Sequence, residues 1–240
     1  MAAKLRLDQE LVTRGLTRTR SQAGSYIKLG QVGVNGQVVT KSGFLVSRVD
    51  QIEVMAAEQY VSRAALKLAS VAEALELDFR DKVVLDVGSS TGGFTDYTLR
   101  HGARKVIAVE VGTGQLHLSL HGNPKIELHE KTDIRDFRTD EKIDLVVADV
   151  SFISLREILP SVAKLCSAKT RIVVMVKPQF EAGHSGLKHK GVIKNDRMRR
   201  DILRDFESWS QAYFVIGGKA DSAVQGAKGN QERFYLLRKA

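Results

Sequence analysis

The sequence is short of the features that mark secreted and membrane-spanning proteins. Its single cysteine, Cys166, excludes an internal disulfide framework and fits a reducing compartment. No apolar run reaches the roughly 18 residues that a transmembrane helix needs. Charged residues interrupt positions 1–15, where a signal peptide would need an apolar stretch. We therefore expect a cytoplasmic protein that does not enter a membrane.

Negative charge is also in short supply, because 37 lysines and arginines face 28 acidic residues and leave a net charge of +9. Such an excess predicts a polyanionic partner. Nucleic acid is favoured over a membrane surface, since no basic amphipathic helix with bulky aromatic residues is present. The basic residues gather in two separate stretches, 4–28 and 188–204, which suggests a long ligand that touches both ends of the molecule.

The first 58 residues have the pattern of a small α+β module. An apolar helical stripe ends at Gly15, and Thr19 can cap a second helix that ends at Gly30. The pair Asn35-Gly36 lies between alternating residues and predicts a β-hairpin. We expect two helices and a small sheet in this part of the chain.

Residues 59–240 alternate strand and helix patterns, which predicts a doubly wound, mostly parallel, Rossmann-like sheet whose last two strands could form an antiparallel pair at one edge. In such a fold, ligands bind beyond the carboxyl ends of the strands. The apolar stretch 172–176 predicts a strand buried on both faces, and Lys177 follows it directly. A lysine at that place is either a snorkelling strand terminator or a cation placed for function.

The stretch LDVGSSTGGFTD follows the first strand of this domain and predicts a ligand-binding turn, because glycines let the backbone approach a ligand closely. Ser90 stands where the dinucleotide-binding fingerprint has its second glycine, so that fingerprint is not met. Asp86 before the first glycine is instead typical of sites for S-adenosylmethionine (SAM). Glu110 ends the second strand, where it can accept from ribose hydroxyls, and Asp133 after the third suits an adenine amino group. This order favours a nucleoside cofactor, SAM before NAD.

Four charged residues lie where catalytic groups would be expected. Asp149 ends the fourth strand and Lys177 the fifth, while Lys67 lies on a helix before the sheet and Glu232 in the loop that enters the last strand. Each of them alone could be a surface charge or a strand terminator. Phe152, three residues after Asp149, is either a core aromatic or a stacking surface for a nucleotide turned out of its helix.

The glycine-punctuated stretch 181–191 is too polar for the core, so we expect a mobile loop over the site. Its histidines, His184 and His189, lack companions at metal-ligand spacing, and no metal site is expected. The sequence leaves the oligomeric state open between a monomer and a homodimer.

Motifs in both parts of the chain resemble known families. The order RLDxxLVxxGL, TRSQA, IKxGxVxVNG and VxxxDxIEV over about residues 5–56 resembles the RNA-binding fold named after ribosomal protein S-four. The motifs SRxxxKL and GNxE are similar to those of FtsJ-type ribose 2′-O-methyltransferases. With DVGSSTGGFTD, ADVSFIS and VKPQFE, they resemble the TlyA family of ribosomal RNA methyltransferases, historically called hemolysin A, over nearly the whole chain.

The resemblance implies an α/β protein with an S-four-type RNA-binding domain at 1–58 and an FtsJ-type SAM-dependent methyltransferase domain at 59–240. It implies SAM as the cofactor, ribosomal RNA as the substrate, and methylation of a ribose 2′-hydroxyl, on cytidine by family likeness. The residues that it implies as catalytic are Lys67, Asp149, Lys177 and Glu232, with Lys177 as the base or proton acceptor. The expected cofactor residues are Asp86, Gly88, Ser89, Ser90, Gly92, Gly93, Phe94, Glu110, Asp133 and Asp149. The expected RNA-binding residues are Lys4, Arg6, Arg18, Arg20, Lys28, Lys41 and Phe152.

Three other classes of function stay open. A non-catalytic RNA-binding or assembly factor would be favoured by loss of the catalytic or cofactor residues, and the sequence shows no such loss. A pore-forming toxin, which the historical family name suggests, would need export and a membrane-inserting segment, and neither is found. A dehydrogenase leaves the four charged residues unexplained.

Overall fold

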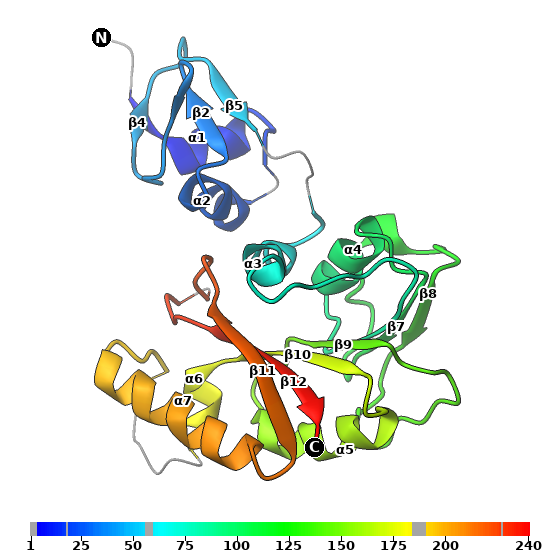
Figure 1. The fold of residues 1–240 in the computed structure, drawn as a ribbon. Helices are drawn as coiled ribbons and strands as arrows, with labels where there is room; N and C mark the ends of the chain where they lie inside the picture. The colour runs from blue at the N-terminus through cyan, green and yellow to red at the C-terminus, as the bar shows by residue number, and fades with distance from the viewer. Residues whose placement is uncertain (1–3, 18, 56–59, 184–190, 227) are drawn as a thin grey trace.

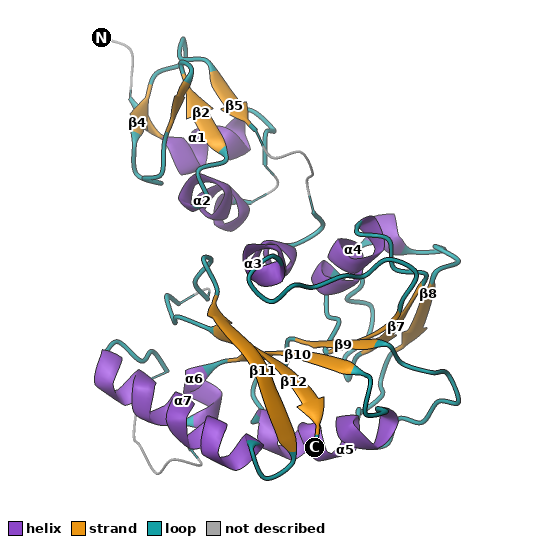
Figure 2. Cartoon of the chain, in the orientation of Figure 1, coloured by secondary structure: helices purple, strands orange, loops and turns teal. Residues whose placement is uncertain are grey.

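The computed structural model describes residues 4–17, 19–55, 60–183, 191–226 and 228–240. A small N-terminal module is followed by a larger domain built on one central sheet (Figures 1 and 2). The predicted division after residue 58 falls within residues 56–59, outside the described residues, so the boundary itself stays a prediction.

The N-terminal module contains two helices and short strands, as the sequence predicted. Thr19 caps the second helix, because its side chain accepts a hydrogen bond of 3.1 Å from the backbone N–H of Gln22. Asn35 and Gly36 have φ of 50° and 77°, as a tight two-residue hairpin turn requires. The pairing of β1 with β4 was not predicted. The elements are β1 (Leu5–Arg6), α1 (Leu7–Thr13), α2 (Arg20–Lys28), β2 (Val32–Val34), β3 (Gln37–Val38), β4 (Leu45–Val46) and β5 (Ile52–Val54).

The larger domain is built on a seven-stranded sheet in the order β11-β12-β10-β9-β6-β7-β8. The strands from β10 to β8 run parallel, whereas β12 is antiparallel to both β10 and β11. The predicted doubly wound sheet with an antiparallel pair at one edge is therefore confirmed. Its elements are α3 (Arg63–Ala72), β6 (Val83–Val87), α4 (Gly93–Arg100), β7 (Lys105–Val109), the 3₁₀ turn η1 (Leu118–Leu120), β8 (Ile126–His129), β9 (Leu145–Ala148), α5 (Leu155–Leu165), β10 (Arg171–Val176), α6 (Pro178–Glu181), α7 (Asp196–Ser210), β11 (Phe214–Asp221) and β12 (Arg233–Lys239).

Helices cover both faces of the sheet, which is why its central strands are continuous apolar runs. Figure 1 shows α3 and α4 on one side of the sheet and α5, α6 and α7 on the other. Alternate residues of a strand point to opposite faces. In β10, Val173 and Met175 join the core on the α3–α4 side, whereas Ile172, Val174 and Val176 join the core on the α5–α7 side.

The register of the sheet brings the carboxyl ends of three strands together. Val87 of β6 pairs with Ala148 of β9, which in turn pairs with Val174 of β10. Asp149 therefore leaves the sheet beside the end of β6. On its other side lies the end of β10, which is followed by Lys177. This edge is where the fold predicts a ligand site.

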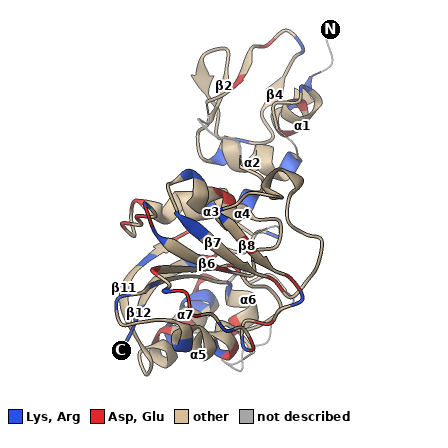
Figure 3. Ribbon diagram, turned by 90° about the vertical axis from the view of Figure 1, so that its right-hand side faces the viewer, with Lys and Arg blue, Asp and Glu red and all other residues tan. Residues whose placement is uncertain are grey.

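Helix α2 of the N-terminal module lies next to the larger domain (Figures 1 and 3). Arg63 on α3 donates a hydrogen bond of 2.6 Å to the side chain of Ser21, and Lys28 donates one of 3.2 Å to the side chain of Gln225. Gln225 belongs to the loop that leads to Glu232 and β12. The basic helix is thus joined to the loop that carries one of the predicted catalytic residues.

The stretch 181–191, which was expected to form a polar loop, begins inside the protein. Glu181 ends the one-turn helix α6, and Glu181 and Ala182 are 1% and 0% exposed. The expectation is wrong at these two positions, because the Glu181 carboxylate finds hydrogen-bond partners in the interior. Residues 184–190, which include both histidines, lie outside the described residues.

Two features from the composition of the chain can be compared with the structure: its single cysteine and the length of its apolar helices. Cys166 is buried, and burial raises the pKa of its thiol to about 12. A thiol with so high a pKa stays protonated and unreactive. Among the described residues, no helix is long and apolar enough to cross a membrane.

Candidate functional site

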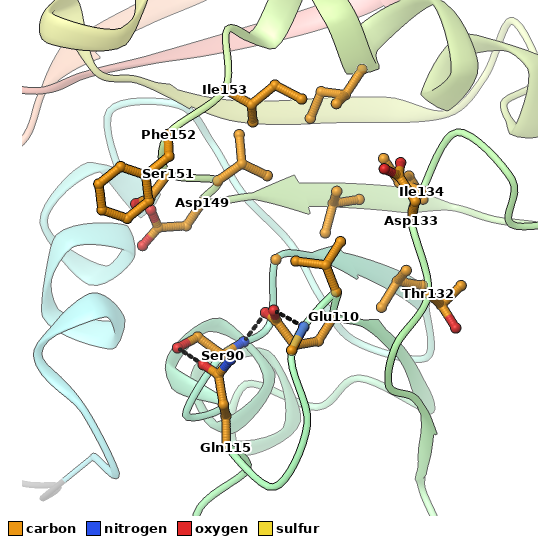
Figure 4. Close-up of a pocket in the computed structure, with 17 residues that line it drawn as sticks. Ser90, Glu110, Gln115, Thr132, Asp133, Ile134, Asp149, Ser151, Phe152 and Ile153 are labelled. Carbon is orange, nitrogen blue, oxygen red and sulfur yellow. Dashed lines mark hydrogen bonds between the residues drawn. The ribbon is translucent and has the colours of Figure 1, made fainter.

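Two cavities adjoin at the carboxyl ends of the central strands. The larger has a volume of about 510 Å³ and the smaller a volume of about 140 Å³. Figure 4 shows Asp149 and Phe152 at one end of the larger cavity and Asp133 at the opposite end. The cavities are neighbours, because they share the lining residues Gly88, Ser90, Asp149 and Ser151.

The turn after β6 depends on its glycines. Gly88 has a φ of +78°, and a side chain there would meet the backbone oxygen of Asp149 at 3.1 Å. Gly92 has a φ of +86°, and a side chain there would collide with Leu116 and Leu120. Gly92 thus lets α4 pack against η1 and lines neither of the two cavities, so its expected contact with a cofactor stays a prediction.

The first turn of α4 forms part of the wall of the smaller cavity. Gly93 and Phe94 both line it. A side chain at Gly93 would collide with Ser62 and Ala64 at the start of α3, so this glycine also serves the packing of two helices. Phe94 is 2% exposed and packs its ring against Phe234, which fixes the floor of the cavity.

Glu110 is fixed at the larger cavity by two backbone groups. Its Oε2 accepts a hydrogen bond of 2.9 Å from the N–H of Ser90, and its Oε1 accepts one of 2.8 Å from the N–H of Gly112 (Figure 4). Each carboxylate oxygen can accept more than one hydrogen bond. Glu110 can therefore still accept from two ligand hydroxyls, while the loops hold its orientation.

Asp133 faces the far end of the larger cavity but is already paired. Its carboxylate receives two hydrogen bonds from the guanidinium of Arg135, at 2.6 and 3.0 Å. These bonds lower the pKa of Asp133 below its ordinary value. A ligand amino group at this end would therefore donate to a charged carboxylate that also accepts from Arg135.

Asp86 has a buried carboxylate oxygen without a hydrogen-bond partner among the described residues. The residue is 0% exposed and lines the smaller cavity, and its Oδ2 accepts a hydrogen bond of 2.6 Å from Thr95 on α4. Its Oδ1 has no hydrogen-bond partner among the described residues. The buried hydroxyl of Ser89, in the wall of the same cavity, also has no partner within that part of the chain. Such atoms at the wall of a cavity are places where a polar ligand or a water molecule would bind.

Burial gives Asp86 a pH-dependent effect on stability. Burial raises the pKa of Asp86 from 3.8 to about 7, the hydrogen bond from Thr95 opposes this change, and the nearby carboxylate of Asp149 adds to it. Between pH 4 and 7 the folded protein therefore keeps a proton that the unfolded chain has lost, so the stability of the unliganded protein falls as the pH rises.

The variant Asp86→Asn is expected to escape this pH dependence. Its stability relative to the wild type should rise by up to roughly 4 kcal/mol from pH 4 to pH 8, which corresponds to the change in the pKa. Urea unfolding of both proteins across this range measures the difference. A difference that stays constant with pH would show that Asp86 titrates normally in the folded protein.

Lys177 is held on two sides at the wall of the smaller cavity. Its Nζ lies 2.6 Å from Oδ1 of Asp149 and donates a hydrogen bond of 2.7 Å to the hydroxyl of Ser151. The residue is 8% exposed and its Nζ lies 6.0 Å from the ring centre of Phe180. A snorkelling lysine would place its ammonium in water, whereas the ammonium of Lys177 is buried and paired; its role as a cation placed for function stays a prediction.

Lys67 and Glu232 form a second buried ion pair, in which the two residues are 6% and 2% exposed. The loop that carries Glu232 is fastened by Asn230, which accepts a hydrogen bond from the N–H of Ile193 and donates one to the backbone oxygen of Gly191. The four residues predicted to be catalytic thus form two ion pairs, one for each lysine, and of the four only Asp149 and Lys177 line the cavities.

Phe152 is exposed and has an unusual backbone conformation. The residue is 92% exposed and has a φ of +66°, in the left-handed region that bulky residues rarely adopt. Its ring lines the larger cavity and lies 5.3 Å from the ring of Phe180. The interpretation of Phe152 as a core aromatic is therefore wrong, and its role as a stacking surface stays a prediction.

The predicted RNA-binding residues of the N-terminal module are mostly exposed. Arg6 and Arg20 both bind Asp8, at 2.9 and 3.0 Å, and leave 47% and 56% of their side chains exposed. Figure 3 shows basic residues on α2, on the side of the module that lies next to the larger domain. Lys4 and Lys41 are exposed, and Arg18 lies outside the described residues.

The structure does not test the prediction that His184 and His189 bind no metal. Within the described part of the chain, no group of three or more histidine, cysteine, aspartate and glutamate residues could hold a metal ion. His184 and His189 fall in the range 184–190, which is not described.

Sequence reasoning missed Ser151, which lines both cavities, and the buried carboxylate of Glu181, which lines neither. Ser151 contacts Lys177, and its place two residues after Asp149 is the signal that could have found it. Glu181 lies four residues after Lys177, but its burial could not be recognised in a stretch so rich in glycine and charge.

Comparisons with known families match both parts of the chain. The family described as FtsJ-like methyltransferase matches residues 60–239, and the S4 domain family matches residues 5–52. The first match contains both cavities and both buried ion pairs, whereas the second contains α1, α2 and the predicted basic residues that follow Lys4.

Relatives of similar length are known. The 16S/23S rRNA (cytidine-2′-O)-methyltransferase TlyA of Mycobacterium tuberculosis is 38% identical over 99% of this chain and 91% of its own length. Hemolysin A of Brachyspira hyodysenteriae is 36% identical over 95% of this chain and 97% of its own length. A solved structure of a hemolysin-named protein from Streptococcus thermophilus superposes with a TM-score of 0.72 at 33% identity and covers 100% of this chain and 90% of that chain.

Proposed function

The chain belongs to the FtsJ-like methyltransferase family, and on that premise we propose that it transfers a methyl group from SAM to a ribose 2′-hydroxyl of ribosomal RNA, with cytidine as the expected nucleoside. The observation that carries this proposal is the Lys177–Asp149 ion pair, in which Asp149 lines both cavities and Lys177 lines the smaller one. A cofactor bound along these cavities would present its reactive group beside this pair.

The residues around the two cavities suit SAM. We propose that Glu110 and Asp133 hold its adenosine part, since both are carboxylates that line the larger cavity. Asp86 and Ser89 would hold its charged amino-acid part, because each has a buried oxygen without a partner among the described residues. When bound, SAM supplies a methyl group that its positively charged sulfur has already activated.

The role proposed for Glu110 can be tested on the isolated protein. Glu110→Ala is expected to weaken SAM binding by roughly 1 to 3 kcal/mol, because the variant loses hydrogen bonds to a charged acceptor. Titration calorimetry measures the change. Glu141→Ala is the matched control, since Glu141 is an exposed carboxylate whose partner is Lys105. Equal affinities of the Glu110 variant and the wild type would contradict the placement of adenosine against Glu110.

The protein's own part in the reaction is alignment and proton removal. A ribose hydroxyl holds its proton at neutral pH and is a poor nucleophile, so the site must position its oxygen and help to remove that proton. We assign Lys177 as the proton acceptor, in the neutral amine form that it takes after its ammonium has released a proton to water, and Asp149 as the residue that orients Lys177. Lys67 and Glu232 complete the network by orienting the hydroxyl and the loop before β12.

The proposed substrate explains features that small-molecule chemistry would not need. Exposed basic residues on the N-terminal module provide phosphate contacts, which give affinity and position without sequence information. A ribose hydroxyl inside a folded RNA is reached by turning the nucleotide out, and an exposed aromatic such as Phe152 can stack on the extruded base.

Methylation mapping tests the proposal directly. Purified protein, SAM with a labelled methyl group and ribosomal subunits that lack the modification are expected to yield label at the ribose of a defined cytidine, located by digestion and mass spectrometry. Label on a base instead of a ribose would contradict the proposed reaction. Binding of SAM and of RNA without any transfer would favour the non-catalytic RNA-binding factor.

A further inference from the structure

The turn between β9 and α5, residues 150–154, is joined to α6 at two places. Near Asp149, the hydroxyl of Ser151 accepts a hydrogen bond from Lys177, which directly precedes α6. At the far end of the turn, Glu181 at the end of α6 accepts hydrogen bonds from the hydroxyl of Ser154, at 2.6 Å, and from the backbone N–H of Leu155, at 2.8 Å. The turn is therefore anchored at both of its ends to the same short helix.

The second anchor is more than the fold of α5 requires. Ser154 already caps α5, because its side-chain oxygen accepts a hydrogen bond of 3.1 Å from the N–H of Arg156. Glu181 is 1% exposed, and burial of a carboxylate is unfavourable unless its oxygens are bonded. Arg156 also lies near, with its Nε 3.7 Å from the Glu181 carboxylate. Ser154, Leu155 and Arg156 all lie at the buried carboxylate of Glu181, so this carboxylate fixes the position of the end of the turn.

Phe152 lies between the two anchors. A bulky residue in the left-handed region is strained and persists only where its surroundings impose that conformation. Phe152 is 92% exposed, so burial does not hold its ring in place. The contacts that can hold it are the anchored ends of its turn and the ring of Phe180, which belongs to α6 as Glu181 does.

We propose that Glu181 is a positioning residue, which keeps the Phe152 ring at a fixed place relative to Lys177 by tying the turn 150–154 to α6. The inference rests on the proposed function, in which Phe152 stacks on the target nucleotide and Lys177 acts on its ribose. Because α6 carries Lys177 at one end and Glu181 at the other, the stacking ring and the lysine share one rigid frame. A nucleotide stacked on Phe152 would then present its ribose at a set place.

The first test removes the anchor. Glu181→Ala is expected to lower kcat/KM for RNA by about 10- to 100-fold, as for the misplacement of a reacting group by about 1 Å. SAM affinity should stay within about threefold of the wild type, since Glu181 lines neither cavity. Glu181→Gln should retain activity within about tenfold, because its amide oxygen can accept from Leu155 and its amide nitrogen can donate to Ser154.

A double-mutant cycle separates positioning from general stability. If Glu181 acts through the Phe152 ring, Glu181→Ala should change kcat/KM less than about threefold in a Phe152→Ala background. An equal loss in both backgrounds would overturn the proposal. Should Glu181→Ala fail to fold, the same cycle with Ser154→Ala replaces it. That variant removes one of the two hydrogen bonds to Glu181 and also the cap of α5, so it is read against a control that weakens α5 elsewhere.

Two controls keep the outcomes distinct. Val162→Ala removes packing from the buried face of α5 away from the turn, and at a temperature where it is folded it should retain wild-type kcat/KM. A loss equal to that of Glu181→Ala would mean that any weakening of α5 is enough. If the wild type itself methylates no RNA, the proposed function fails, whereas an active wild type with an additive cycle rejects only the role of Glu181.

Discussion

Lys177→Ala is expected to lower the rate of methyl transfer by a factor of about 10² to 10⁴, as typical for removal of a positioned base. SAM and RNA affinity should change little, because the predicted contacts of both ligands are made by other residues. The variant should also lose stability, because it leaves the mostly buried carboxylate of Asp149 without its partner, so transfer is measured at a temperature where the variant is folded. Single-turnover transfer to ribosomal subunits, measured at saturating SAM, isolates the chemical step.

Lys177→Arg tests how the lysine works. Arginine keeps the positive charge beside Asp149, but its guanidinium stays protonated at any usable pH and cannot accept a proton. An inactive arginine variant that binds SAM and RNA would support proton acceptance or a need for the shape of an ammonium. Turnover near that of the wild type would contradict the assignment, and the proton acceptor would then have to be a water molecule or another residue.

Lys67→Met is expected to destabilise the protein by about 3 to 5 kcal/mol, because it leaves the carboxylate of Glu232 buried without its partner. The double variant Lys67→Met with Glu232→Gln removes both charges, so most of the lost stability should return. Activity should stay low in both variants, since Lys67 has lost its charge in each of them and Glu232 has lost its charge as well in the double variant. Urea unfolding and single-turnover transfer measure the two effects separately.

An exposed ion pair provides the matched comparison for the buried one. Arg80 and Asp78 pair at 2.9 Å with 80% and 49% of their side chains exposed, so Arg80→Met should leave stability nearly unchanged. If the double variant at Lys67 and Glu232 regained activity along with stability, the buried pair would have only a structural role.

Much of the fold could be predicted from local sequence patterns. The stretch 172–176 is apolar without interruption because helices cover both faces of the strand, and that pattern is visible without coordinates. The hairpin at Asn35-Gly36 and the cap at Thr19 depend on nearest neighbours in the chain, so the sequence predicted both. The pairing of β1 with β4 was missed, because strands of two residues have no recognisable period.

The candidate site could also be predicted only in part: local patterns predict which residues belong to it, whereas their partners depend on contacts between distant segments. The sequence by itself determined which residues follow the strands, because strand ends and the glycine turn are local features, and it therefore placed Asp149, Lys177 and Glu110 at one edge of the sheet. Only the tertiary structure decided the partners of these residues. It pairs Lys177 with Asp149 and Lys67 with Glu232, leaves Oδ1 of Asp86 without a partner among the described residues, exposes the Phe152 ring and buries Glu181. Those outcomes depend on the distances between segments far apart in the chain and on the free energy of burying each charge, and neither quantity can be read from neighbouring letters.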